Sequence, residues 1–303
     1  MSVVAERTRT IPVAQPYDLG ATLFPLRRGT LDPTMRIAGR ECWRASRTPD
    51  GAVTLHVVDV GSGVQATAWG PGAEWALEHV PGLIGALDDL SAFEPRDDVM
   101  KAVWKAYRAV RLTRALDVVR TLIAAVLEQK VVGLEARRAW RRLARLEREP
   151  APGPGGLILP PDPARVAELP YFAFHPLGVE RRRAEVIRDV CRRAASLEAL
   201  SDVPFEQANL RLQMIPGIGP WTAAEVVRLS FGDPDAVSIN DYHLPDIVAW
   251  ALAREPRGTD ERMLELLEPY RGQRGRVQRL LEASHIAPPA FGPRAEAREI
   301  ERF

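Results

Sequence analysis

The feature that most restricts the fold is a tight turn at residues 215–220, with the sequence IPGIGP, between two segments of helical period. The flanking segments read FEQANLRLQM and WTAAEVVRLSF, and each repeats its apolar residues at the spacing of one helix face. Glycines at positions 217 and 219 indicate a turn too tight for a side chain at either position. Pro220 suits the first turn of the second helix, where a missing N–H leaves no helical hydrogen bond unmade. The turn therefore predicts a helix-hairpin-helix.

The backbone of this turn also predicts a site for an anion. Free N–H groups at Gly217, at Gly219 and at the start of the second helix would point outward together, at the positive end of that helix. Such a nest can hold a phosphate of DNA without any side chain. A tight turn of this kind can also be purely structural, and both interpretations stay open. The candidate DNA-contacting residues of the hairpin are Pro216, Gly217, Ile218 and Gly219.

The rest of the chain divides into a strand-rich front and a helical remainder, which predicts an α+β fold. Residues 35–70 hold four short β-type segments, MRIAG, CWRAS, AVTLHVVDV and VQATAWG, with turn signals at 49–51 and 61–63. Helical period begins near residue 71 and dominates after residue 95, and residues 115–132 are apolar nearly all round, as in a buried central helix. Six prolines and three glycines in residues 150–163 predict a connection across the surface.

From this pattern we predict three parts. They are a small N-terminal antiparallel β domain at residues 1–95, an all-helical helix-hairpin-helix domain at 96–287 and a C-terminal tail at 288–303.

Composition excludes several classes of protein. Two cysteines cannot supply the four thiolates of an iron–sulfur cluster, so redox chemistry through such a cluster is not expected. The 41 basic residues include only three lysines, Lys101, Lys105 and Lys130, so phosphate-binding arginines are plentiful and candidate Schiff-base amines are few. No apolar run approaches the ~20 residues of a membrane span, and the start lacks the pattern of a signal peptide. We expect a cytoplasmic protein with no membrane partner.

The segment after the hairpin carries a family resemblance. The hairpin continues as Pro-Trp-Thr-Ala, and Asp241 follows twenty positions after Trp221, within the sequence VSINDY at 237–242. This combination resembles the helix-hairpin-helix DNA glycosylase superfamily. Trp221 and the Asn-Asp-Tyr step are similar to the 3-methyladenine DNA glycosylase II branch, which excises alkylated bases. The resemblance spans residues 100–290, and the strand-rich front end is also similar to that branch.

Asp241 matches the catalytic aspartate that the resemblance implies, beside the sugar of a flipped nucleotide. Cleavage of an N-glycosidic bond leaves an oxocarbenium-like sugar, so a fixed carboxylate stabilises the developing positive charge and can orient the attacking water. The local rivals are Asp233, Asp235 and Asp246, whose alternative role is to cap a turn or a helix.

Trp221 occupies the position where bifunctional members of the resembled superfamily carry a Schiff-base lysine. An indole cannot form that adduct, and no lysine follows residue 130, so we expect a monofunctional enzyme that uses water. The indole could stack on an alkylated purine, or it could simply pack the hairpin. The candidate substrate-binding residues are Trp221, Gln129 and Tyr242.

Lys130 departs from the resembled branch, which places an apolar wedge near this position to fill the gap left by the flipped base. A lysine can bridge phosphates but cannot unstack a duplex as an apolar wedge does. Further arginines occur after residue 270 and in runs at 181–183 and 137–142. Their side chains could bind DNA phosphates, or they could simply be solvated. The remaining DNA-binding candidates are Lys130, Arg271, Arg274 and Arg276.

The resulting hypothesis is a monofunctional glycosylase of base excision repair that releases alkylated purines of the 3-methyladenine type from double-stranded DNA. We expect a monomer, cytoplasmic and associated with the bacterial nucleoid, with no organic cofactor. The resemblance also implies a monovalent cation, Na or K, at the hairpin backbone. Two alternatives remain: a glycosylase of the same fold for another base, such as a deaminated one, and a non-catalytic protein that binds DNA damage.

Overall fold

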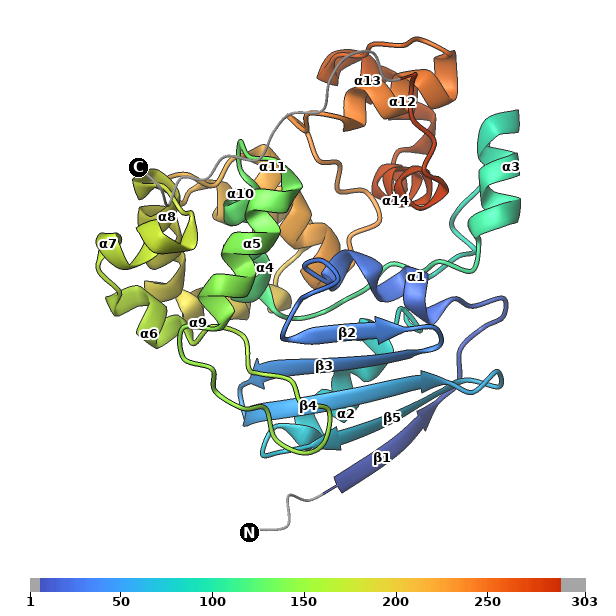
Figure 1. Cartoon of the computed structure of the whole chain (residues 1–303). Coiled ribbons are helices and arrows are strands. Elements are labelled where there is room, and N and C mark those ends of the chain that lie inside the picture. The colour runs from blue at the N-terminus through green and yellow to red at the C-terminus, as the bar shows by residue number, and fades with distance from the viewer. Residues whose placement is uncertain (1–5, 290–303) are drawn as a thin grey trace.

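The computed structural model describes residues 6–289, and its front end is one antiparallel sheet (Figure 1). The strand order is β1-β5-β4-β3-β2. The strands are β1 (Glu6–Ile11), β2 (Met35–Ala38), β3 (Glu41–Thr48), β4 (Gly51–Asp59) and β5 (Val64–Trp69). The four predicted segments all form strands. Sequence analysis missed β1, because its sequence ERTRTI has no apolar face, and only Ile11 is buried.

Each face of the sheet is covered by a different part of the chain. The helices α1 (Leu19–Leu23) and α2 (Ala73–Leu83), with the short η1 (Phe24–Leu26), share one hydrophobic core with the buried strand residues. The proline-rich connection covers part of the sheet in a second, small cluster, where Leu157 and Leu159 pack with Ala45. Two of its glycines lie against Trp69 and Trp43. The predicted surface connection is therefore confirmed.

The helices after the sheet gather around two further cores. The first group surrounds α4, whose residues 118–127 are all buried, as predicted for the central helix. It comprises α4 (Val118–Glu128), α5 (Gly133–Ala144), α6 (Pro163–Glu168), α7 (Tyr171–Phe174), η2 (His175–Leu177), α8 (Arg181–Arg192), α9 (Ala194–Glu198), η3 (Ala199–Asp202), α10 (Phe205–Gln213), α11 (Pro220–Val226) and the π-helical η4 (Val227–Phe231).

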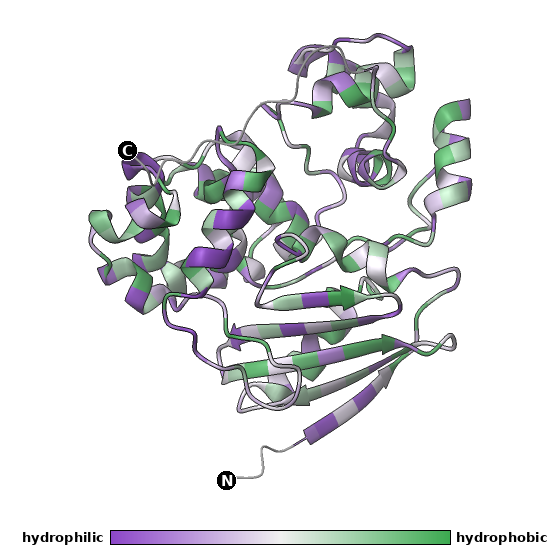
Figure 2. Cartoon of the chain, in the orientation of Figure 1, coloured by the Kyte–Doolittle hydropathy of each residue, from purple (hydrophilic) through white to green (hydrophobic). Residues whose placement is uncertain are grey.

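The second group contains helices from two distant parts of the chain. It comprises α3 (Asp98–Tyr107), α12 (Leu244–Ala253), α13 (Asp260–Leu267), η5 (Glu268–Tyr270) and α14 (Arg274–Ser284). The helix α3 precedes α4 in sequence but packs with α14, on the opposite side of the molecule from α5–α8 (Figure 1). Hydrophilic residues concentrate on α5 in the first group and on β1 in the sheet, whereas β4 and β5 carry longer hydrophobic stretches (Figure 2).

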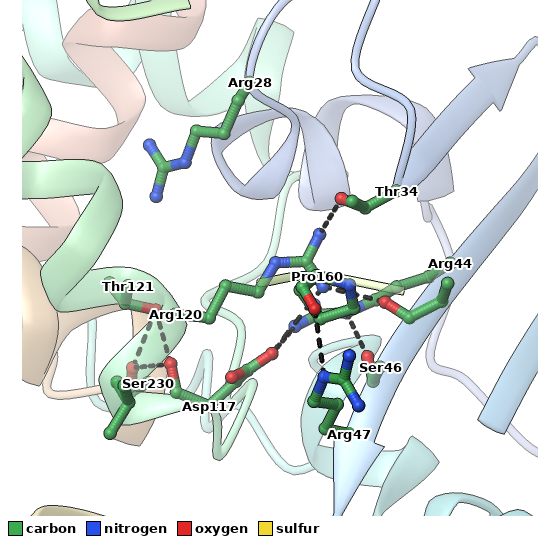
Figure 3. A network of polar contacts seen from close by, with 12 residues as sticks. Arg28, Thr34, Arg44, Ser46, Arg47, Asp117, Arg120, Thr121, Pro160 and Ser230 are labelled. Atoms are coloured by element: carbon green, nitrogen blue, oxygen red, sulfur yellow. Dashed lines mark hydrogen bonds and ion pairs between the residues drawn. The ribbon is translucent and has the colours of Figure 1, made fainter. Parts of the chain in front are cut away.

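A buried polar cluster joins the sheet to the start of α4 (Figure 3). Arg44 on β3 donates from Nη2 to Oδ2 of Asp117 at 2.9 Å. Arg120 donates to the carbonyl of Ala45 at 2.9 Å and to the hydroxyl of Thr34 at 2.6 Å. Both guanidinium groups are almost fully buried, so each hydrogen bond replaces one that water would otherwise make. This cluster fixes the first helical group on the sheet.

The α+β fold class, a small antiparallel sheet followed by many helices, is confirmed. The predicted boundary at residue 95 stays a prediction. The predicted tail at 288–303 lies outside the described residues from position 290 on. Within residues 6–289, no helix is both long enough and apolar enough to cross a membrane.

Candidate active site

The hairpin between α10 and α11 needs glycine at one of its two glycine positions. Gly217 has φ +91°, and a Cβ atom there would lie 2.3 Å from Cγ2 of Val186 on α8. Gly219 instead has φ −95°, and a Cβ there would meet nothing within 4 Å. The expectation that the turn excludes side chains at both positions is therefore wrong for Gly219. Its missing side chain leaves open space beside the first turn of α11.

The hairpin is tied to the end of α4 by Gln129. Its Nε2 donates to the carbonyl of Gly217 at 3.0 Å and to the hydroxyl of Thr222 at 2.9 Å. The next residue, Lys130, is exposed and has a left-handed backbone with φ 56°, which is unfavourable for a residue other than glycine. Gln129 thus has partners within the protein, and it places Lys130 beside the hairpin.

Asp241 lies where the two helical groups meet, in the loop that leads into α12. Its Oδ2 accepts a hydrogen bond from the indole Nε1 of Trp221, the second residue of α11, at 2.9 Å. Its Oδ1 accepts from the backbone N–H groups of His243 and Leu244, both at 2.8 Å. The carboxylate is therefore held from both sides, and it remains partly exposed. The structure brings together Trp221 and Asp241, which sequence analysis had placed at one site.

The rival aspartates are committed to other partners. Asp233 accepts from the N–H of Asp235, as expected for a turn cap. Burial would raise the pKa of Asp235, but its hydrogen bonds with Arg274 outweigh that effect and lower the pKa below its ordinary value. Asp246 accepts from Arg257 and from the N–H of Gly258. None of these three carboxylates has an indole donor like that of Asp241 in the hydrogen bonds of residues 6–289.

The basic candidates differ widely in their exposure. Arg276 is wrong as a DNA contact, because its side chain is only 3% exposed and pairs with Asp88 at 2.5 Å. Arg274 is partly exposed and is held by Asp235. Arg271 pairs with Glu268 at the surface. Because its side chain is exposed, it remains available to a phosphate. In the run at 181–183, Arg183 is buried and donates to the carbonyl of Leu127 at 2.9 Å, which caps the end of α4.

Tyr242 is the most exposed of the large hydrophobic residues in the part of the chain that the structure describes. It is 88% exposed and makes an edge-to-face contact with His243, with 4.8 Å between ring centroids. Its place directly after Asp241 puts an aromatic ring at the rim of the site. Its role as a substrate contact stays a prediction.

A closed ring of polar side chains, of which Ser238, Arg228 and Gln278 are buried, lies behind the Asp241 loop, and sequence analysis missed it. Ser238 donates from Oγ to Glu225 at 2.5 Å, and Gln278 donates from Nε2 to that Oγ at 3.0 Å. Gln278 also donates to Glu282 at 2.9 Å. Arg228 completes the ring, because it pairs with Glu282 at 3.0 Å and with Glu225 at 2.8 Å. One signal was available in the sequence: Glu225 follows Trp221 by four residues, the spacing of one helix face.

A second acid lies at the other edge of the site. Glu128, the last residue of α4, pairs with Arg28 at 3.4 Å. Burial raises the pKa of its carboxyl above the ordinary range. Among the described residues, no group of three or more His, Cys, Asp or Glu side chains is arranged to hold a metal ion. Both cysteines are buried as free thiols, and burial raises the pKa of each to about 12.

Comparison with known proteins agrees with the resemblance seen in the sequence. No protein-family model matches the chain. DNA-3-methyladenine glycosylase 2 of Escherichia coli is 30% identical over 135 residues, which are 44% of this chain and 48% of that protein. The probable bifunctional transcriptional activator/DNA repair enzyme AlkA of Mycobacterium tuberculosis is 27% identical over 151 residues, 49% of this chain and 30% of that protein. The chain spans less than half the length of the curated relatives it matches.

The fold of a solved structure matches nearly the whole chain. The 3-methyladenine DNA-glycosylase from Archaeoglobus fulgidus superposes with a TM-score of 0.78 at 16% identity, covering 91% of this chain and 98% of that one. The resemblance to the helix-hairpin-helix DNA glycosylase superfamily, and within it to the 3-methyladenine branch, is confirmed.

Proposed function

We propose that this chain, which is similar to helix-hairpin-helix DNA glycosylases in fold and over part of its sequence, hydrolyses the N-glycosidic bond of alkylated purines in double-stranded DNA. The observation that carries the proposal is the hydrogen bond of 2.9 Å from the Trp221 indole to the Asp241 carboxylate. It joins α11, the hairpin helix of the first helical group, to the loop that leads into α12 of the second. Binding and chemistry would therefore meet at one place.

The fixed carboxylate suits the charge that develops during this reaction. As the base leaves, positive charge grows on the sugar, and a preorganised negative group stabilises it without having to reorient. Three hydrogen-bond donors hold Asp241, two from the start of α12 and one from Trp221. The same carboxylate can orient a water molecule for attack on the anomeric carbon. An alkylated purine is cationic and leaves readily, so one carboxylate suffices.

The tryptophan at position 221 favours a monofunctional reaction, because an indole cannot form a Schiff base with the sugar. No lysine follows residue 130, so an amine nucleophile would have to come from Lys101, Lys105 or Lys130. Of these, Lys130 lies beside the hairpin and Lys101 pairs with Asp98 on the exposed side of α3. We therefore propose that water, and not an amine, attacks the sugar, which leaves an abasic site and an intact backbone.

The DNA contacts we propose surround the hairpin. The open space at Gly219 lets a phosphate approach the N–H groups at the start of α11, where the helix end is positive. Lys130 lies on one side, and Arg271 on the second helical group is exposed. Tyr242 and Trp221 would offer aromatic surface to a flipped base.

A monovalent cation at the hairpin belongs to the same proposal. The carbonyl of Gly217 accepts from Gln129 and that of Ile215 accepts from the N–H of Ile218, so each keeps one lone pair. The hairpin backbone is therefore compatible with such an ion, which would supply positive charge near the phosphate. Action as a monomer at the bacterial nucleoid in the cytoplasm is part of the proposal too.

The test is release of free base from methylated DNA, resolved by chromatography, with wild type and Asp241→Asn side by side. We expect wild type to release methylated purines. Asn keeps the shape and removes the charge, so Asp241→Asn should lower the rate at least about 100-fold, the size of other electrostatic catalytic effects. Its DNA affinity should stay within about threefold, because nonspecific binding depends on phosphate contacts.

The outcomes separate the three hypotheses. A variant that keeps wild-type turnover would remove Asp241 from the reaction. Release of deaminated bases from suitable DNA, without release of methylated purines, would favour the alternative substrate. Binding of damaged DNA without any release would favour the non-catalytic protein.

A further inference from the structure

We propose that Glu225, Ser238 and Gln278 are positioning residues for Asp241. Together with Arg228 and Glu282 they form the closed polar ring behind the loop, and the ring holds the Asp241 carboxylate at the Trp221 indole. The inference rests on the proposed function for its kinetic consequence, whereas its structural consequence can be measured without any activity.

The helix α11 holds the Asp241 loop at two points. Trp221 and Glu225 lie one turn apart on the same face of the helix. Trp221 binds the carboxylate of Asp241, and Glu225 accepts from the hydroxyl of Ser238, three residues earlier in the loop. The N–H of Asp241 donates to the carbonyl of Ser238 at 3.2 Å, which closes the turn between the two points. These two contacts together set the orientation of the loop relative to α11.

The helix α14 holds the same loop from the other side. The N–H of Ser238 donates to Oε1 of Gln278 at 3.1 Å, and Nε2 of Gln278 donates back to Oγ of Ser238 at 3.0 Å. Ser238 is fully buried, so its backbone and hydroxyl have no access to water. Gln278 in turn reaches Arg228 through Glu282. The ring therefore connects the first helical group, through α11 and η4, with the second, through α14.

The composition of the ring indicates a role beyond stability. Buried ion pairs of this kind are weak sources of stability, because well-packed apolar side chains often serve as well. The guanidinium of Arg228 is buried here, Glu225 is largely buried and Glu282 is 31% exposed. They lie directly behind a loop that also carries Asn240 at φ 69°. Buried charge and backbone strain together are typical of sites where orientation is held for function.

Removal of one hydroxyl tests the proposal. Ser238→Ala deletes the hydroxyl's contacts with Glu225 and with Nε2 of Gln278, and it keeps the backbone bond to Oε1 of Gln278. We expect single-turnover base release to slow by about 10- to 100-fold, because a displacement of ~1 Å at a reacting group can cost that much. The dissociation constant for DNA should stay within about twofold, since the hairpin is untouched.

Ser230→Ala is the matched control. Ser230 is also fully buried, lies on η4 and bonds through its hydroxyl to that of Thr121 at 3.1 Å, away from the Asp241 loop. Both variants lose one buried hydroxyl and should lose similar thermal stability. Only Ser238→Ala should slow base release. Equal rates for the two variants would overturn the proposal.

A second measurement follows the Trp221 indole directly. The seven tryptophans give indole N–H resonances in a spectrum of protein labelled with ¹⁵N at tryptophan, and Trp221→Phe identifies the resonance of interest. We expect this resonance to shift in Ser238→Ala and to stay in place in Ser230→Ala. An unchanged resonance in Ser238→Ala would overturn the positioning role. A shifted resonance, combined with no base release by wild type, would refute the proposed function and leave the positioning role standing.

Discussion

Two clusters of polar side chains, here called joints, each link separate parts of the described structure. They differ in what lies beside them. The sheet joint, formed by Arg44, Asp117 and Arg120, fixes β3 to the start of α4. Beside it lies the rest of that helix, which is buried over residues 118–127. The loop joint, the ring around Ser238, lies three residues from a partly exposed carboxylate. Similar side chains thus hold the fold in one place and a candidate reactive group in the other.

The two joints also carry opposite charge. The sheet joint has two guanidinium groups around Asp117, and burial together with the charge of Arg44 lowers the pKa of Arg120 to about 10. The loop joint has two carboxylates around Arg228, whose pKa is raised by those partners despite its burial. Loss of the single central charge would leave two like charges close together in either joint, and in the sheet joint both of them are buried. The comparison predicts that such a loss strongly destabilises the fold, whereas loss of the Ser238 hydroxyl costs less stability and mainly changes the orientation of the Asp241 loop.

The largest effect is expected at the centre of the sheet joint. Asp117→Ala leaves Arg44 and Arg120 buried without their shared partner, and it should lower the free energy of unfolding by about 3–5 kcal/mol. Chemical denaturation followed by circular dichroism would measure the loss. The double variant Asp117→Ala with Arg44→Met should recover part of it, because one of the two stranded charges is gone.

A surface pair provides the control for this prediction. Asp98 pairs with Lys101 at 3.0 Å, and both side chains are exposed, so Asp98→Ala should cost less than about 1 kcal/mol. A cost as small for Asp117→Ala would show that the sheet joint does not hold the fold.

An intermediate effect is expected at the hairpin. There we expect one glycine to matter for stability and the other for DNA affinity. Gly217→Ala requires a left-handed backbone, which costs about 1–2 kcal/mol, and its Cβ would also displace Val186. Gly219→Ala has neither problem and should change stability by less than about 0.5 kcal/mol. Its Cβ would occupy the space proposed for a phosphate, so we expect DNA affinity to fall about tenfold, or about 1.4 kcal/mol.

Fluorescence anisotropy with damaged and undamaged duplexes would test the hairpin pair. A clamp that reads no bases should weaken equally for both duplexes in Gly219→Ala. Wild-type affinity in that variant would place the DNA site elsewhere. Wild-type stability in Gly217→Ala would contradict the role of its positive φ.

The sequence was sufficient for the features that depend on local pattern. Helical period located α4 and the hairpin, and turn signals located four of the five strands. The spacing of twenty residues between Trp221 and Asp241 indicated one site, and the structure brings these side chains within hydrogen-bond distance. These features depend on neighbours in the chain or on a single family pattern, which a sequence displays directly.

Contacts between distant segments could not be predicted in this way. Arg276 has the same sequence context as the exposed Arg271, but its partner Asp88 lies 188 residues away. Ser238 and Gln278 are 40 residues apart, and they meet only because α14 packs against α12. The strand β1 forms through backbone pairing with β5, without an apolar face to reveal it. Charge and polarity in a sequence do not specify the partner that buries them.

The smallest effect we predict concerns Glu198, whose carboxyl lies beside the sheet joint. It accepts hydrogen bonds from the N–H groups of Val118 and Val119, at 3.0 and 2.9 Å, at the start of α4. Burial, followed by the nearby charge of Asp117, raises its pKa from 4.5 to about 7. The unfolded chain releases this proton near pH 4.5 and the folded chain does so near 7. The stability that the protonated carboxyl contributes is therefore complete below pH 4.5 and is lost as pH rises through 7.

Glu198→Gln should remove this pH dependence, because the amide stays neutral and its oxygen can still accept from α4. The melting temperature of the variant minus that of wild type should be about 2–4 °C larger at pH 8 than at pH 5. Glu94→Gln, at an exposed position, should follow wild type at both pH values. A pH-independent difference between Glu198→Gln and wild type would mean that this carboxyl does not titrate between pH 5 and 8. The charge of the groups around the sheet joint would then be insensitive to pH in this range.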